Sequence, residues 1–233
     1  MKKITTLILC ALHLSLFAQF DVEWGDEIND KSRVELFLPS SANDFFQLRL
    51  VTPSFGSIHY TLNHYHDLSL THSEIFEIKF EDQDQVKNKN EQKKIIKLTT
   101  LNNLPIIFIK HNFENKNYLY YQKYKNDCKP DGYPVKIAES EVNEVAKKYA
   151  FNVLVSDDHD FVCIISPDID SHEKAKVDQD QPFKYKFYIY TKEMELLTSG
   201  EYAVESASYS HFIPEITNQG ELFLIARNYT IID

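Results

Sequence analysis

The stretch that decides the fold is FVCIISP, at Phe161–Pro167. Three other stretches line up with it: FFQLRLV from Phe45, PIIFIKH from Pro105 and LFLIARN from Leu222. Each is a short run of β-branched, aromatic and aliphatic residues, the composition that favours strands. Their starts lie about 60 residues apart, near the upper edge of known propeller-blade periods. The spacing predicts a repeated structural unit rather than four unrelated strands.

Each of the first three runs has strand-like neighbours on both sides. The preceding strands are RVELFLP from Arg33, KKIIKLTTL from Lys93 and YAFNVLVS from Tyr149. Aromatic strands follow, starting at Ile58, Tyr118 and Tyr185, and the units close with EIFEIKF (74–80), PVKIAES (134–140) and EYAVES (201–206). Units of four short strands, separated by Asn, Asp and Pro turns, are typical of the blades of a β-propeller.

We therefore expect an all-β, β-propeller-like array of four-stranded antiparallel blades. About three complete blades are predicted, at residues 33–80, 93–140 and 149–206, with a partial fourth at 207–233. Stacked sheets cover each other's faces, which explains why FVCIIS and LPIIFI are continuously apolar. Closed propellers have roughly four to eight blades. Because fewer complete blades are predicted than a closed propeller has, we favour an open arc, whose exposed blade edge would bind a protein partner. The alternative is that FDVEWGDE, residues 20–27, closes the ring.

Two segments depart from regular strands. The acidic loop at residues 168–181 lengthens one turn of the third unit, and SEVNEVAKKYA at residues 140–150 predicts one or two helical turns. The chain has only 5 Gly. We therefore expect most turns to use Asn and Asp, which tolerate positive φ.

The N-terminus, MKKITTLILCALHLSLFAQF, has the three parts of a secretory signal: basic residues, an apolar run and a small residue, Ala18, before the cut. It predicts a signal peptide at residues 1–18 and an exported domain at 19–233, periplasmic or at the cell surface. The apolar run is shorter than a bilayer requires, so we expect no transmembrane segment after cleavage. Lipid attachment at Cys10 is disfavoured because Ile8 and Leu9 precede it.

The charge of the chain argues against nucleic acid as a partner. The formal net charge is −10, and the one basic stretch, KNKNEQKK at residues 87–94, lies among acidic residues. Nucleic-acid binding depends on neutralising phosphates with basic groups. Two cysteines remain after signal cleavage, Cys128 and Cys163. Export permits a disulfide between them, but the apolar run around Cys163 favours a buried thiol.

The order and spacing of these motifs resemble a known family. FNVLVSDDHDFVCII is similar to the strand pair of TolB-like and WD-like propellers, and PEITNQGELFLIAR is similar to their closing strand. With its composition and the signal end at Phe17-Ala18-Gln19, the chain resembles uncharacterised exported β-propeller-like proteins of Bacteroidetes, as a short or truncated member. It departs from them where Asp157-Asp158-His159 replaces a Pro-Asp-Gly turn. The resemblance carries over no catalytic residue.

Metal binding has weak candidates. His64 and His66 lie two apart, so they share a face of a strand and could ligate one ion. Asp168 and Asp170 offer calcium-type oxygens, but the pattern Asp168-x-Asp170-x-His172 lacks the glycine of a calcium loop and has a histidine at the third ligand position. The favoured interpretation is an amphipathic strand for the histidines and a solvated loop for the aspartates. No cofactor is expected.

The sequence has no nucleophile elbow, phosphate loop or dinucleotide glycine run. We therefore expect a non-enzymatic scaffold or binding module at the cell envelope, with an unknown ligand. The tyrosine-rich strand NYLYYQKY and the acidic content support an alternative, a carbohydrate-binding or carbohydrate-active propeller protein. A truncated fragment without independent activity is the third hypothesis.

Overall fold

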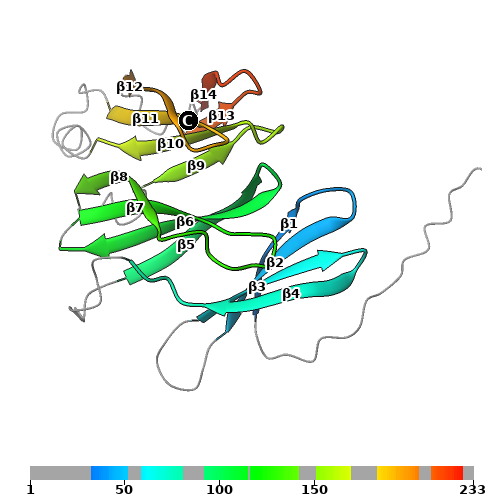
Figure 1. The fold of residues 1–233 in the computed structure, drawn as a ribbon. Coiled ribbons are helices and arrows are strands. Elements are labelled where there is room, and N and C mark those ends of the chain that lie inside the picture. The colour runs from blue at the N-terminus through cyan, green and yellow to red at the C-terminus, as the bar shows by residue number, and fades with distance from the viewer. Residues whose placement is uncertain are drawn as a thin grey trace, which may run out of the picture. The chain divides into compact units, whose positions relative to one another are not determined.

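Every regular element of the structure is a β-strand. The computed structural model describes residues 33–51, 59–80, 92–114, 116–141, 151–168, 183–204 and 211–227, and no helix occurs in these ranges. Their strands form three four-stranded sheets and one two-stranded sheet, all antiparallel (Figure 1). Each sheet contains only strands that are consecutive in the chain. The all-β class and the four-stranded antiparallel units are thus confirmed.

The first sheet has the order β1-β2-β3-β4, from Arg33–Pro39, Asp44–Val51, His59–His66 and Ser69–Phe76. The second has the order β5-β6-β7-β8, from Gln92–Leu101, Leu104–Phe113, Lys116–Lys123 and Val135–Glu141. The third has the order β9-β10-β11-β12, from Asn152–Val155, Phe161–Pro167, Phe183–Thr191 and Leu196–Val204. The last sheet pairs β13 with β14, His211–Ile216 with Leu222–Arg227.

Two closing strands begin earlier than the sequence pattern predicted. β4 begins at Ser69, five residues before the predicted strand, and β12 begins at Leu196 instead of Glu201. A tight turn precedes each strand, and before β12 the N–H of Met194 donates to the carbonyl of Thr191. Asp67 and Leu68 have φ values of 46° and 64°, the left-handed pair that closes a two-residue hairpin. β4 therefore begins directly after this turn, at Ser69, with residues that are mostly polar.

The central strands of the second and third sheets bury side chains on both faces because another sheet packs on either side of them. On β6, Ile107 and Ile109 lie in a cluster with the first sheet, whereas Ile106 and Phe108 lie in a cluster with the third. The first cluster is Leu38, Phe46, Leu48, Leu62, Phe76, Phe80, Leu98, Ile107, Ile109, Tyr124 and Cys128. The second is Leu101, Ile106, Phe108, Leu119, Ala138, Val153, Val162, Ile164, Tyr190 and Met194.

A third cluster joins the third sheet to the final hairpin. Cys163, Ile165 and Ile189 pack there with Ile216 of β13. Successive sheets therefore pack in chain order, and every described residue belongs to one compact unit. Cys128 and Cys163 are both buried free thiols in different clusters. No disulfide joins them.

Most of the described turns contain Asn or Asp, as expected, but these residues do not supply most of the positive φ angles. Of the non-glycine residues with positive φ, Asp67, Asn102 and Asn103 are of these types, whereas Leu68, Glu114, Cys128, His159 and Met194 are not. Cys128, Met194 and Gly220 occupy the same turn position, each donating its N–H to the carbonyl three residues back. The first two have buried side chains, so core packing there offsets the cost of a left-handed backbone.

Several predictions fall outside the described residues. These are the signal peptide, the closing segment 20–27, residues 142–150 of the predicted helical turns, and all but Asp168 of the acidic loop. Ser140 and Glu141, predicted to begin those helical turns, instead end β8. Among the described residues, β14 pairs with β13 alone, and no helix there is long and apolar enough to span a membrane.

Candidate functional site

A polar pocket of about 320 Å³ lies where the hairpin turns of the three four-stranded sheets meet. Its lining residues come from the β1–β2, β5–β6, β9–β10 and β11–β12 turns: Pro39, Ser40, Thr100, Asn102, Asn103, Asp158, His159, Asp160 and Lys192. The volume is at the lower end of the range for small-molecule sites, roughly 300–1,000 Å³. The pocket exists because four turns, from three different sheets, end at one place.

Hydrogen bonds hold these turns to one another. The Ser40 hydroxyl donates to the carbonyl oxygen of Asn103 at 2.8 Å, joining the first sheet to the second. The imidazole Nδ1 of His159 lies 2.7 Å from the carbonyl oxygen of Thr100, joining the second to the third. Because a carbonyl only accepts, Nδ1 carries the proton in this bond. The backbone of the pocket is therefore positioned by side chains of the pocket itself.

The β9–β10 turn is organised by two polar side chains. The Ser156 hydroxyl donates to Asp158 at 2.7 Å, and the N–H of Asp160 donates to the same carboxylate at 3.1 Å. The hydrogen bond from Ser156 is the largest cause that lowers the pKa of Asp158. His159 has a φ of 61°, in the left-handed region that favours glycine. Its side chain thus provides the bond to Thr100 from an unusual backbone conformation.

An ion pair lies at the edge of the pocket. The Lys192 ammonium lies 2.7 Å from Asp160, and both side chains are partly exposed. This hydrogen bond is the main cause that raises the pKa of Lys192. With Asp158 ionised and Asp160 paired, the pocket offers a carboxylate, an ammonium, an imidazole and two side-chain amides to a ligand. These groups suit hydrogen bonding to a polar molecule.

The two predicted histidines lie together but around a carboxylate that the prediction did not include. His64 and His66 both contact Oδ1 of Asp44, at 3.2 and 2.9 Å. Asp44 lies opposite His66 in the β2–β3 pairing, and its other oxygen accepts the Ser41 hydroxyl at 2.7 Å. His64 also stacks on Phe46, with ring centroids 4.5 Å apart. The expected strand surface is thus a hydrogen-bonded cluster.

The order of groups in this cluster bears on its chemistry. Serine-type catalysis needs the imidazole between the hydroxyl and the carboxylate. Here the carboxylate of Asp44 lies between Ser41 and the two imidazoles, so neither ring can take the hydroxyl proton directly. The cluster acts as a hydrogen-bonded support for the β1–β2 turn, which also places Ser40 in the pocket.

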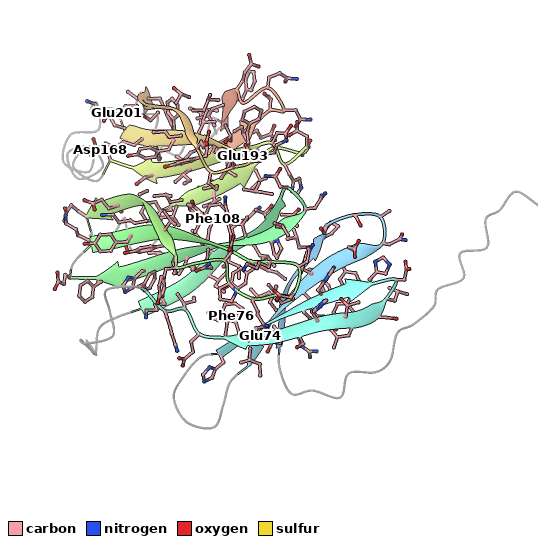
Figure 2. The ribbon with its side chains drawn as sticks, in the orientation of Figure 1. Glu74, Phe76, Phe108, Asp168, Glu193 and Glu201 are labelled. Atoms are coloured by element: carbon pink, nitrogen blue, oxygen red, sulfur yellow. The ribbon has the colours of Figure 1, made fainter. Side chains whose placement is uncertain are left out.

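The predicted calcium residues do not come together with the histidines. Asp168 directly follows β10 in the third sheet (Figure 2), where its N–H donates to the carbonyl of Lys184 at 2.8 Å. Asp170 lies outside the described residues. Within the part of the chain that the structure describes, no group of three or more His, Cys, Asp or Glu side chains is arranged to hold a metal ion.

Sequence reasoning missed the pocket itself. Its carboxylates, Asp158 and Asp160, come from a single turn, so acidic groups of different sheets do not converge there. The one available signal in the sequence was the turn Asp157-Asp158-His159. No family model, curated protein or solved structure matches this chain.

Proposed function

We propose that the protein is an exported, non-enzymatic, β-propeller-like binding module that takes a small polar ligand in the pocket at its hairpin turns. The observation that carries the proposal is the construction of this pocket. Turns from three successive sheets line it, and hydrogen bonds between turns hold it in shape. A preorganised concave site with a few convergent polar groups is the usual form of a ligand site.

Contacts between first strands support a radial, propeller-like arrangement. The nearest approaches between different sheets include β1 with β5, β5 with β9 and β9 with β13. These are the first strands of successive units, as expected if first strands line a common axis. The burial of both faces of β6 and β10 is also expected of blades stacked around such an axis.

The ligand site can be tested by substitutions at its edge. Purified protein would be screened with small polar molecules by thermal shift, and hits would be measured by calorimetry. Lys192→Gln and Asp158→Asn should each weaken binding about tenfold or more, as loss of a charge-assisted hydrogen bond predicts. Lys186→Gln is the matched control, because Lys186 is an exposed lysine of β11 outside the pocket.

Two results would contradict the proposal. One is a ligand whose affinity is unchanged by both pocket substitutions. The other concerns export: expressed with its native N-terminus, the protein should appear in the periplasmic or extracellular fraction, and purely cytoplasmic fractionation would count decisively against an exported module.

A carbohydrate is the second candidate ligand, and the chemistry of the pocket lining favours it. Asn102, Asn103 and Asp158 present amide and carboxylate groups, which can hydrogen-bond to sugar hydroxyls as both donors and acceptors. Glycan arrays combined with hydrolysis assays would test this candidate. Binding without hydrolysis would identify a lectin-like module, and hydrolysis would contradict the non-enzymatic proposal. The absence of both binding and hydrolysis would exclude carbohydrates.

A further inference from the structure

The charged groups of the polar pocket all belong to turns of the third sheet. Asp158 and Asp160 come from the β9–β10 turn, and Lys192 comes from the β11–β12 turn, next to Glu193, which Figure 2 labels. The lining residues from the other two turns are uncharged: Pro39, Ser40, Thr100, Asn102 and Asn103. The charge of the pocket is therefore confined to the part that the third sheet forms.

Asp158 keeps one oxygen available to a ligand. Its Oδ1 accepts the Ser156 hydroxyl at 2.7 Å and the N–H of Asp160 at 3.1 Å. No other described residue donates a hydrogen bond to Oδ2, and no described residue forms an ion pair with Asp158. The hydrogen bond from Ser156 is the largest cause that lowers the pKa of Asp158. The available oxygen therefore belongs to a carboxylate ion at neutral pH.

Lys192 also has unused hydrogen-bonding capacity. An ammonium has three N–H donors, and among the described residues only Asp160 forms an ion pair with this one, at 2.7 Å. Asp160 joins the two charged groups, because its N–H binds Asp158 and its carboxylate binds Lys192. The carboxylate of Asp158 and the ammonium of Lys192 are thus linked through a single residue, and each can take a further partner.

Two opposite charges with unused capacity restrict the charge of the ligand. A ligand that covers them displaces water from both ions, which is costly unless the ligand provides counter-charges. A neutral ligand provides none. A simple cation meets the ammonium of Lys192, and a simple anion meets the carboxylates of Asp158 and Asp160, so each gains an attraction and suffers a repulsion. A ligand that carries both charges close together matches both groups.

We propose that the ligand of this pocket is a free α-amino acid, whose ammonium binds Asp158 and whose carboxylate binds Lys192. This inference rests on the proposed function, because it assigns a ligand class to the same pocket. Both charges of an α-amino acid are attached to one carbon, so they match protein charges that are linked through one residue. His159 adds an acceptor: Nδ1 carries the proton of the bond to Thr100, so Nε2 of the neutral ring accepts.

The two charges of the ligand can be removed one at a time. The twenty protein amino acids would be screened by thermal shift, and calorimetry would compare the best binder with its N-acetyl and carboxamide derivatives. N-acetylation removes the ammonium charge, and amidation removes the carboxylate charge. Each change should raise the dissociation constant about tenfold or more, as loss of a charge-assisted hydrogen bond predicts.

Substitutions in the protein assign each ligand charge to its partner. In Asp158→Asn, N-acetylation should raise the dissociation constant about twofold or less, whereas amidation should keep its full effect. In Lys192→Gln the reverse should hold, because the partner of the removed carboxylate is already absent. Lys186→Gln is the matched control, since Lys186 lies outside the pocket, and both effects should persist in it.

The outcomes separate this inference from the proposed function. If a sugar or another polar molecule binds through Asp158 and Lys192 while no amino acid binds at millimolar concentration, the pocket is a ligand site but the amino-acid assignment is wrong. An amino acid whose affinity neither derivative changes also overturns the assignment. If no small polar molecule binds, the inference and the proposed function both fail. The comparison of derivatives requires only the wild-type protein, so it decides the matter even if a variant fails to fold.

Discussion

The imidazole Nδ1 of His159 lies 2.7 Å from the carbonyl oxygen of Thr100, a residue 59 positions earlier in the chain. The Thr100 hydroxyl is 3.0 Å from the same nitrogen. One side chain in a turn of the third sheet thus binds the end of β5 in the second. It does so from a backbone with φ of 61°, a conformation that costs an ordinary residue about 1–2 kcal/mol. At His159 the hydrogen bond between sheets therefore stabilises the fold, whereas the left-handed backbone destabilises it.

This opposition predicts an order of stabilities at position 159. His159→Ala loses the bond and keeps the strain, so the free energy of unfolding should fall by about 1–3 kcal/mol. His159→Gly loses the bond but relieves the strain, so it should be about 1 kcal/mol more stable than the alanine variant. Urea unfolding would measure both. Gly220, at a similar position of the last hairpin with φ of 75°, is the control, because Gly220→Ala should also lose stability. An alanine variant at 159 as stable as the glycine variant would contradict the strain argument.

A larger residue at Gly200 should lower the free energy of unfolding while Phe187 is present. A Cβ added at Gly200 would lie 2.8 Å from the Phe187 ring, closer than van der Waals contact allows. Gly200→Ala should therefore cost about 1 kcal/mol or more in unfolding free energy. The cost should shrink when Phe187→Leu removes the ring, so a double-mutant cycle is the measurement. Additive effects of the two changes would show that the contact carries no energy.

The two buried thiols should be inert in the folded protein. Burial is the main cause that raises the pKa of Cys128 and of Cys163 to about 12, and the thiolate is the reactive form. Alkylation by iodoacetamide near pH 8 should be at least ~100-fold slower at both residues than in the denatured chain. Peptide mapping by mass spectrometry would follow each site separately. A disulfide-linked peptide pair from the non-reduced protein would contradict the structure.

The Asp44 cluster predicts a pH dependence with a defined sign. Hydrogen bonds, the largest from Ser41, lower the pKa of Asp44 from its ordinary value of 3.8 to about 2. The stabilising contribution of Asp44 is therefore present above pH 3.8 and is lost as the pH falls toward 2. The hydrogen bond to Asp44 is the main cause that raises the pKa of His66 above 6.5. The contribution of His66 is therefore full below pH 6.5 and is lost as the pH rises through its higher folded pKa.

NMR titration of the histidine ring would measure this shift directly. In the wild type the pKa of His66 should exceed 6.5, and Asp44→Asn should return it toward that value. The stability difference between the wild type and His66→Asn should shrink as the pH rises above neutrality. A difference that grows with pH would contradict the assigned ion pair. Because both side chains are solvent-accessible, the effect should weaken with added salt.

Local composition made the strands predictable. β10 is observed with the predicted bounds, Phe161–Pro167, because a run of β-branched and aromatic residues between turn residues has few alternatives to a strand. The sequence pattern predicts no strand at β13, His211–Ile216, whose HFIPEI contains a proline, a residue that usually argues against a strand. In the structure Pro214 pairs with Leu224 in a two-stranded sheet, where fewer ladder hydrogen bonds are required of it.

The sequence alignment of the units failed by one residue at the third unit. Aligning the first residues of the runs makes Ile106 equivalent to Val162, but the two lie in the same cluster from opposite sheets. Ile106 faces the following sheet, as Cys163 does in the third unit. A shift of one residue exchanges the two faces of a strand. A run that is apolar on both faces contains no alternation with which to detect the shift.

By itself the sequence determined where most of the described strands form and that four-stranded units repeat, because strand propensity and turn chemistry act between near neighbours in the chain. Only the tertiary structure decided which face of each strand meets which sheet, that Asp44 joins His64 and His66, and that turns from three sheets enclose one polar pocket. These features depend on contacts between residues far apart in the chain. No local pattern records such contacts, since a turn residue such as His159 has the same local sequence whether or not Thr100 lies opposite it.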